Sequence, residues 1–148
     1  MTEVMHGKVK TLYDVPGEAE KVLIKYEDKV TAFDGKMVDY PESKGTVCCL
    51  ISALLFEKLQ DAGIKTHYLS MPPHGVVVTM DPCKVTCCKK VNIIPIEVVV
   101  RNFVAGSLCR QTYLREGIAL NPPLVEFYLK DDDKNDPLLT IDRMERMG

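Results

Sequence analysis

Apolar residues recur at helical spacing between residues 44 and 62, which predicts the longest helix of the chain. The repeating positions are Val47, Leu50, Ile51, Leu54, Leu55 and Leu59. Gly63 follows this stretch, and glycine is the usual residue in the left-handed turn that ends a helix. We therefore expect a helix from Lys44 to Ala62.

Shorter stretches with alternating or continuous apolar residues predict strands. Three of them before the helix, at 8–15, 21–26 and 30–33, predict an antiparallel meander with turns at Pro16-Gly17 and Asp34-Gly35. After the helix, the predicted strands are 66–71, 75–80, 85–91, 95–104 and 124–129.

A second, shorter helix is predicted from Ser107 to about Arg115, with the Ser107 hydroxyl capping its first turn and Gly117 ending it. Residues 130–148 are polar and are expected to add little to the core. Helices combined with mostly antiparallel strands indicate an α+β fold.

Composition narrows the class of protein. The chain has 148 residues, of which 46% are hydrophobic and 27% charged, as in ordinary globular domains. A net charge of −2 argues against nucleic acid or a membrane surface as a partner, because both attract clustered positive charge. No apolar run approaches the roughly 20 residues of a membrane span, and the N-terminus lacks the apolar core of a signal peptide. We therefore expect a cytoplasmic protein.

The chain contains six cysteines, at Cys48, Cys49, Cys83, Cys87, Cys88 and Cys109. Adjacent pairs suit a disulfide framework poorly, and thiols stay reduced in the cytoplasm. Cys83, Cys87 and Cys88, with His74 nearby, could in principle hold zinc, but their spacing lacks a Cys-x-x-Cys pair. We favour reduced, half-buried thiols and assign no metal-ligating residue.

Two lysines near the N-terminus are candidates for phosphate binding. Lys8 and Lys10 flank Val9 behind Gly7, and alternation along a strand would place both ammonium groups on one face. Such a pair beside a glycine suits polyphosphate. A solvated strand face is the alternative interpretation, since lysine is seldom buried.

Arg101 and Ser107 flank a second candidate site. An apolar strand carrying one acid, Glu97, ends at Arg101, and Ala105-Gly106-Ser107 then turns the chain into the second helix. Free N–H groups, a hydroxyl and a guanidinium together suit an anion. A capped helix beside a surface arginine explains the same pattern equally well.

Two further charged positions have open interpretations. Glu97 is costly on an apolar strand unless it is paired, and Lys89 or Lys90 is the expected partner; orienting a lysine or a ligand is the other role. Lys130 precedes three aspartates and could contact a nucleotide or a metal, or belong to a solvated acidic turn.

Ordered motifs across residues 5 to 140 resemble those of the SAICAR synthetase (phosphoribosylaminoimidazole-succinocarboxamide synthase) family. Residues 93–107 read Ile-Ile-Pro-Ile-Glu-Val-Val-Val-Arg-Asn-Phe-Val-Ala-Gly-Ser, which is similar to the family signature. Residues 7–13 resemble the family's Gly-Lys-x-Lys-x-x-Tyr. Further matching segments follow in the family's order, at 31–36, 44–45, 62–67, 89–90, 116–117, 120–123 and 136–137.

The resemblance implies a fold and a reaction. It implies an antiparallel, β-rich ATP lobe at residues 1–92, followed by the first part of an α+β substrate lobe at residues 93–148. The family's enzymes use ATP and Mg²⁺ to join carboxyaminoimidazole ribonucleotide to L-aspartate in purine biosynthesis. ATP phosphorylates the carboxylate of the ribonucleotide, and the amine of aspartate then attacks the acyl phosphate.

The resemblance also implies roles for individual residues. Lys8 and Lys10 would hold the ATP phosphates, and residues 90–96, with Lys90 and Ile93, would run beside adenine. Lys130 would contact the nucleotide. The 5′-phosphate of the ribonucleotide would be held by Arg101 and Ser107. The motifs assign no catalytic residue.

Two departures from the family pattern bear on activity. Cys48-Cys49-Leu50 stand where the family usually has Asn-Asn-Lys. The later motifs Asp-x-Lys-x-Glu-x-Gly and Asp-Glu-x-x-x-Pro-Asp, with their metal-binding acids, do not occur in this sequence. We therefore expect a truncated member or one part of a split enzyme, with weak or no ligase activity alone.

The same departure leaves open what the chain associates with. It predicts an uncovered apolar face on the strand 95–104, through which the chain would form homo-oligomers or bind a complementing C-terminal chain. A non-catalytic nucleotide-binding fragment is the alternative function.

Overall fold

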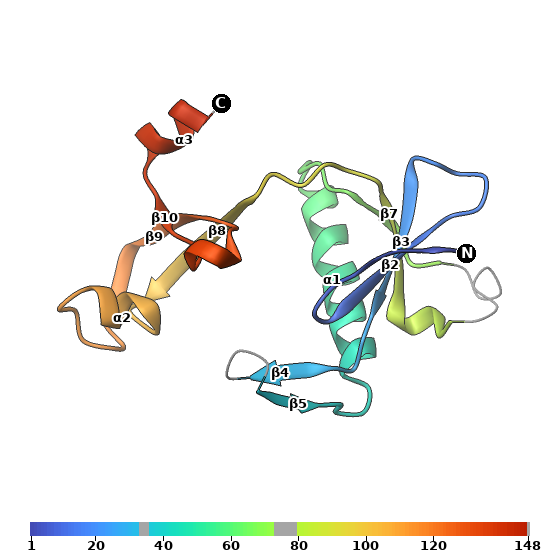
Figure 1. The fold of residues 1–148 in the computed structure, drawn as a ribbon, viewed down its shortest axis with the longest axis horizontal. Coiled ribbons are helices and arrows are strands. Elements are labelled where there is room, and N and C mark those ends of the chain that lie inside the picture. The colour runs from blue at the N-terminus through green and yellow to red at the C-terminus, as the bar shows by residue number, and fades with distance from the viewer. Residues whose placement is uncertain (33–35, 73–79, 148) are drawn as a thin grey trace. The chain divides into compact units, whose positions relative to one another are not determined.

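The computed structural model describes residues 1–32, 36–72 and 80–147, and it divides the chain into two compact units. The first unit is Met1–Asn92 and the second is Ile93–Gly148. Both contain antiparallel sheets together with helices, so the predicted α+β class is confirmed (Figure 1).

A five-stranded sheet forms the body of the first unit, with its strands in the order β1-β2-β3-β7-β6 and every neighbouring pair antiparallel. The strands are β1 (Glu3–His6), β2 (Lys10–Asp14), β3 (Lys21–Tyr26), β6 (Tyr68–Ser70) and β7 (Val85–Lys89). The predicted strand at 21–26 matches β3 residue for residue. The other strands predicted for this sheet are each longer than the strands observed.

Alternation along β3 builds a small core on each side of this sheet. Val22 faces α1, where it packs with Ala53, Tyr68 and Cys88. Leu23 faces the other side and packs against Val85. The long helix α1 (Lys44–Asp61) therefore covers only one side of the sheet (Figure 1).

Helix α1 begins where the pattern predicts and ends one residue earlier, but its apolar stripe faces outward. Its buried residues are the small ones, Gly45, Cys49 and Ala53, spaced four apart. The large apolar residues of the predicted stripe are exposed, at Val47, Leu50, Ile51, Leu54, Leu55 and Leu59. The helix approaches β3 closely, and only small side chains fit between the two elements. The small residues are therefore the buried ones.

Helix α1 ends in a left-handed turn at Gly63, as the sequence predicts. Gly63 adopts a φ of +79°. Its N–H bonds the carbonyl of Gln60 at 2.9 Å, and the N–H of Ile64 bonds the carbonyl of Leu59 at 2.9 Å. This pair of bonds is the Schellman arrangement, which satisfies carbonyls that the last helical turn leaves unpaired.

The predicted N-terminal meander is partly wrong. The strand β4 (Val30–Ala32) leaves the main sheet and pairs with β5 (Met37–Asp39) in a separate two-stranded sheet. Its place in the meander is taken by β1, which the sequence pattern did not indicate. The predicted turn at Asp34-Gly35 and most of the predicted strand 75–80 lie outside the described residues.

A three-stranded antiparallel sheet in the order β10-β9-β8 forms the second unit. Its strands are β8 (Ile96–Phe103), β9 (Ala119–Leu129) and β10 (Leu138–Leu139). Leu139 is buried, so the C-terminal segment adds to the core where the sequence predicted little. The helix α3 (Ile141–Met147) then ends this segment.

The pairing register gives the β8–β9 ribbon two unlike faces. Directly opposite residues share a face, and so do alternate residues along each strand. The residues of one face, called here the polar sheet face, include Glu97, Arg101, Glu126 and Tyr128. Those of the other, called here the apolar sheet face, include Val98, Val100, Val125 and Phe127.

The second short helix, α2, differs from its prediction at both ends. It covers only Ser107–Gln111 and does not reach Arg115. Gly106 is its N-cap residue, and no side chain caps it, so the predicted capping by Ser107 is wrong. The Ser107 hydroxyl is engaged instead by Arg101.

Candidate functional site

Lys8 and Lys10 do not lie on one strand face, and this expectation is wrong. Lys8 falls in the turn between β1 and β2, and Lys10 is the first residue of β2. The N–H of Gly7 donates to the carbonyl of Lys10 at 2.8 Å and closes the turn. Both lysines are exposed at this hairpin, so their charges remain close along the chain without sharing a face.

Lys10 borders a hollow of about 370 Å³ between the hairpin and α1. Its ammonium lies 4.6 Å from the centroid of the Tyr26 ring, within range of a cation–π contact. Lys44 also lines this hollow, but its ammonium is committed to the carbonyls of Glu27 and Lys29. Of these two cations, Lys10 is therefore the one better placed to meet an anion in the hollow.

Two residues that depart from the family pattern, Cys48 and Cys49, differ in their surroundings. Cys48 lines the hollow, whereas Cys49 is completely buried. The Cys49 thiol lies 3.8 Å from the sulfur of Met71, and burial raises its pKa to about 11. Cys49 therefore acts as a core residue, with no polar function.

All six cysteines are free, and among the described residues no group of three His, Cys, Asp or Glu side chains is placed to hold a metal ion. Burial raises the pKa of both Cys87 and Cys88, which stabilises the thiol over the metal-binding thiolate. His74, the fourth member of the possible zinc set, lies outside the described residues.

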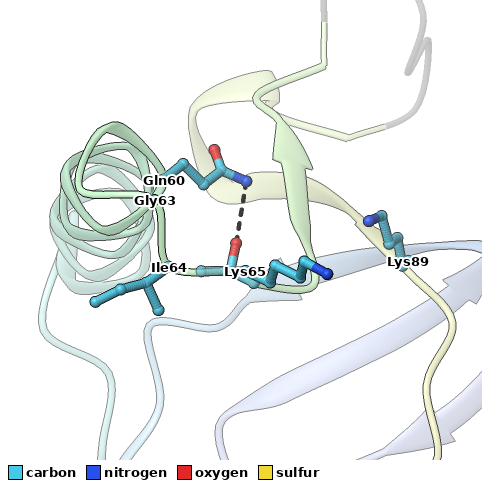
Figure 2. Close-up of a pocket in the computed structure, with 6 residues that line it drawn as sticks. Gln60, Gly63, Ile64, Lys65 and Lys89 are labelled. Atoms are coloured by element: carbon cyan, nitrogen blue, oxygen red, sulfur yellow. Dashed lines mark hydrogen bonds between the residues drawn. The ribbon is translucent and has the colours of Figure 1, made fainter.

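A second hollow of the first unit lies at the end of α1 and has a volume of about 280 Å³. Figure 2 shows Lys65 and Lys89 beside it, with the Gln60 amide donating to the Thr66 hydroxyl at 3.0 Å. Apart from Gln60, its lining falls on two segments that match the family's order, 62–67 and 89–90. The sequence pattern indicated both segments but gave no ligand-binding role to Lys65 or Lys89.

The segment after β7 is apolar and exposed. Ile93 is 85% exposed and Ile94 is 72% exposed, and Val91 is exposed as well. Lys90 makes an ion pair with Asp14 at 3.6 Å, where both side chains are about half exposed. Such exposed aliphatic side chains offer a surface on which a flat ring can pack.

Arg101 and Ser107 are brought together by the second unit. The Nη2 of Arg101 donates to the Ser107 hydroxyl at 2.9 Å, and its Nη1 donates to the carbonyl of Ala105 at 3.4 Å. The Nε donates to Oε2 of Glu126 at 2.6 Å. The sequence pattern did not indicate Glu126, because only the strand register places it beside Arg101.

The guanidinium of Arg101 retains capacity for a ligand. The Glu126 carboxylate, followed by the Tyr128 hydroxyl, raises its pKa further, so it remains a cation. A guanidinium carries five N–H groups. The three hydrogen bonds to Glu126, Ala105 and Ser107 leave two of the five for Tyr128, which also bonds the guanidinium, and for a ligand.

Glu97 pairs with Lys130, and the predicted partners Lys89 and Lys90 are wrong. Its carboxylate lies 3.7 Å from the Lys130 ammonium, because β9 runs antiparallel to β8 and ends beside Glu97. Lys130 also contacts Asp136 at 2.6 Å. The lysine predicted to contact a nucleotide is therefore held between two acids.

The described acids near Lys130 do not form a ready site for Mg²⁺. Lys134 binds Asp131 at 2.6 Å and lowers the pKa of that carboxyl group, and Lys130 does the same for Asp136. Each carboxylate thus already has a cation, whereas a magnesium site needs oxygen ligands directed at one point. These acids therefore do not fit the ion as they stand.

Within the described ranges, no helix is both long and apolar enough to cross a membrane.

The two antiparallel units and the elements that position these cations define an α+β protein. The chain belongs to the SAICAR synthetase family, whose model matches residues 3–148.

Named relatives and solved structures agree with this assignment. The phosphoribosylaminoimidazole-succinocarboxamide synthase of Synechocystis sp. is 46% identical over 100% of this chain and 52% of its own length. The crystal structure of the synthase from Ehrlichia chaffeensis matches with a TM-score of 0.86 and 31% identity, over 99% of this chain and 57% of that chain. A SAICAR synthetase (Type-2) in complex with ADP matches with a TM-score of 0.81 and 31% identity, over 98% and 62%.

The chain spans about half the length of the curated relatives that it matches.

Proposed function

We propose that this chain carries the ATP-binding and ribonucleotide-phosphate-binding part of a SAICAR synthetase. The reaction joins carboxyaminoimidazole ribonucleotide and L-aspartate, with conversion of ATP to ADP and phosphate. The observation that carries the proposal is the Arg101 guanidinium, which is fixed beside the Ser107 hydroxyl and whose bonds to Glu126, Ala105 and Ser107 do not use all of its N–H groups. The names of the relatives support the assignment to this reaction.

The chemistry explains why such a site needs fixed cations. A carboxylate is a poor electrophile, so ATP first transfers its γ-phosphoryl group to it and releases ADP. The amine of aspartate then attacks the acyl phosphate, forms the amide, and expels phosphate with loss of a proton. Fixed positive groups stabilise the phosphoryl charge as it moves.

For ATP, we propose that Lys8 and Lys10 contact the phosphates and that the apolar segment at 90–96, with Lys90 and Ile93, packs beside adenine. The exposure of Ile93 supports this role, because an aliphatic side chain gains by covering a flat ring. A family member bound to ADP gives further support. Lys130 is proposed as an additional nucleotide contact.

For the ribonucleotide, we propose that Arg101 and Ser107 bind the 5′-phosphate. A guanidinium matches two phosphate oxygens with two parallel N–H bonds, and the hydroxyl supplies a third donor. The Arg101 side chain is only 15% exposed, which keeps its charge from being fully screened by water.

We also propose that catalysis needs groups beyond those described, since Asp131 and Asp136 are each already paired with a lysine. The partner that we propose is a polypeptide equivalent to the half of the relatives that this sequence does not span. The exposed apolar sheet face is its docking surface. A cytoplasmic location, as expected of purine biosynthesis, completes the proposal.

A turnover assay tests this function. The purified chain is mixed with ATP, L-aspartate and carboxyaminoimidazole ribonucleotide, and ADP and the amide product are measured with and without the remaining half of the Synechocystis relative. We expect little or no product from the chain alone and clear product from the mixture. Binding of ATP without product in either case would favour the alternative, a non-catalytic nucleotide-binding fragment.

A further inference from the structure

The polar sheet face holds a linked set of side chains around Arg101. Glu126 lies on β9 opposite Val99, one alternate position from the partner of Arg101. Its Oε2 accepts from the Nε of Arg101 at 2.6 Å and from the Tyr128 hydroxyl at 3.1 Å. The Glu126 side chain is 10% exposed, so this carboxylate is held mostly away from water.

The edge of the guanidinium that Glu126 uses is informative. A carboxylate often binds arginine with both oxygens and thereby occupies two N–H groups. Here the ion pair joins Nε to a single oxygen. The opposite side of the guanidinium, with Nη1 and Nη2, is left for Ser107, Ala105 and a ligand.

We propose that Glu126 is a positioning residue, which holds Arg101 so that its Nη groups meet the phosphate of the substrate. Tyr128 fixes the carboxylate in turn through its hydroxyl. This inference rests on the proposed function of Arg101 and adds the residue that fixes the orientation of the Arg101 side chain. An arginine side chain has many rotamers, and fixing it before binding removes that ordering cost from the binding step.

The negative charge of Glu126 and the position that it gives to Arg101 have opposite expected effects on anion binding, so the inference can be tested. The negative charge of Glu126 opposes an anion at Arg101, so removing that charge should strengthen binding if charge were all that mattered. Loss of the fixed Nε bond should weaken binding if position dominates. Glu126→Ala removes both the charge and the bond, whereas Glu126→Gln removes the charge but keeps an oxygen that can accept from Nε.

The experiment is calorimetric titration of the full chain with inorganic phosphate and with a nucleoside 5′-monophosphate. We expect Glu126→Ala to bind about tenfold more weakly than wild type, and Tyr128→Phe about two- to threefold more weakly. Glu126→Gln should bind at least as tightly as wild type. Glu145→Ala, which removes one exposed acid from α3 in the same unit, is the matched control and should not weaken binding.

The outcomes separate this inference from the proposed function. If Glu126→Ala binds the phosphate probes as tightly as wild type or more tightly, Glu126 only neutralises Arg101 and the inference is overturned. If Glu126→Ala does not fold, an unweakened Tyr128→Phe together with a weakened Glu126→Gln overturns it. If wild type itself binds neither probe, the proposed phosphate site fails, and the positioning role fails with it.

Discussion

The first turn of α1 approaches β3 so closely at Gly45 that a methyl group has no room. A Cβ atom built there would lie 2.5 Å from the carbonyl oxygen of Tyr26, a backbone atom that cannot rotate away. We predict that Gly45→Ala lowers the free energy of unfolding by about 2 kcal/mol, as overpacking does elsewhere, despite the better helix propensity of alanine. Urea unfolding of the purified variant measures this.

Val47→Ala is the matched control, because Val47 lies two residues further along the same helix and is exposed. Its effect should stay within about 0.5 kcal/mol. Equal stabilities of Gly45→Ala and wild type would show that α1 does not pack this closely on β3.

The contacts of the Asp28 carboxylate predict how the stability of the folded state depends on pH. Its carboxylate accepts from Lys84 at 2.6 Å and from the N–H of Gly45 at 2.7 Å. The lysine, followed by the N–H, lowers its pKa below the ordinary 3.8. A carboxyl group whose pKa is lower in the folded state stabilises the fold above its unfolded pKa, and this contribution disappears as the pH falls through the folded value.

We therefore predict that Asp28→Asn is less stable than wild type at neutral pH, and that the difference shrinks as the pH falls below 3.8. Thermal unfolding at a series of pH values measures both trends. Asp133→Asn, at an exposed position of the second unit, should show neither. A difference that grows on acidification would contradict the assigned direction of the pKa.

At the scale of elements, the β1–β2 hairpin provides the test of ATP binding. Lys8→Ala combined with Lys10→Ala should weaken ATP binding by about 1.5–3 kcal/mol for each charged hydrogen bond that the substitutions remove. Calorimetric titration with ATP measures the change. The double variant Lys58→Ala and Lys134→Ala removes the same charge from exposed positions elsewhere and serves as control. Unchanged affinity in the hairpin variant would remove both lysines from the proposed site.

Local patterns predicted those elements whose signals lie within their own residues. Helix α1 has a repeating apolar spacing and a glycine stop, and β3 has clear alternation, so both were placed almost correctly. The direction of the α1 stripe was not predicted, because apolar spacing does not say which side of a helix is covered. The packing of Gly45 and Ala53 against β3 decides that.

The missed features of the site depend on pairing between distant residues. The sequence pattern does not indicate β1 and therefore predicts Lys8 on a strand, whereas Lys8 lies in the turn before β2. Glu97 was given a partner close in sequence, whereas the register of β8 with β9 brings in Lys130. The proximity of Arg101 and Ser107 could be predicted because they belong to one strand-to-turn motif, but Glu126 could not.

For the whole molecule, the apolar sheet face predicts association. Val98 and Val100 are each 58% exposed and Val125 is 48% exposed, so a contiguous apolar face meets water. Such a face favours contact with another polypeptide. In the absence of a complementing chain, we predict that copies of this chain associate through it as concentration rises, as measured by analytical ultracentrifugation.

Charge placed on this face should prevent association. Val98→Lys should shift the chain toward monomer, whereas Val38→Lys, at an exposed valine of β5 in the first unit, should leave association unchanged. A wild-type chain that stays monomeric at high concentration would show that the face is not adhesive.

The central claim is that this chain binds two different phosphate-bearing ligands through two different sets of cations, and paired calorimetric titrations test it most directly. Wild type, the Lys8 and Lys10 double alanine variant, and Arg101→Lys are each titrated with ATP and, separately, with carboxyaminoimidazole ribonucleotide. We predict that wild type binds both, that the hairpin variant loses affinity only for ATP, and that Arg101→Lys loses affinity only for the ribonucleotide, since an ammonium cannot replace the guanidinium fork. Failure of wild type to bind either ligand, or equal losses of both affinities in both variants, would contradict the account.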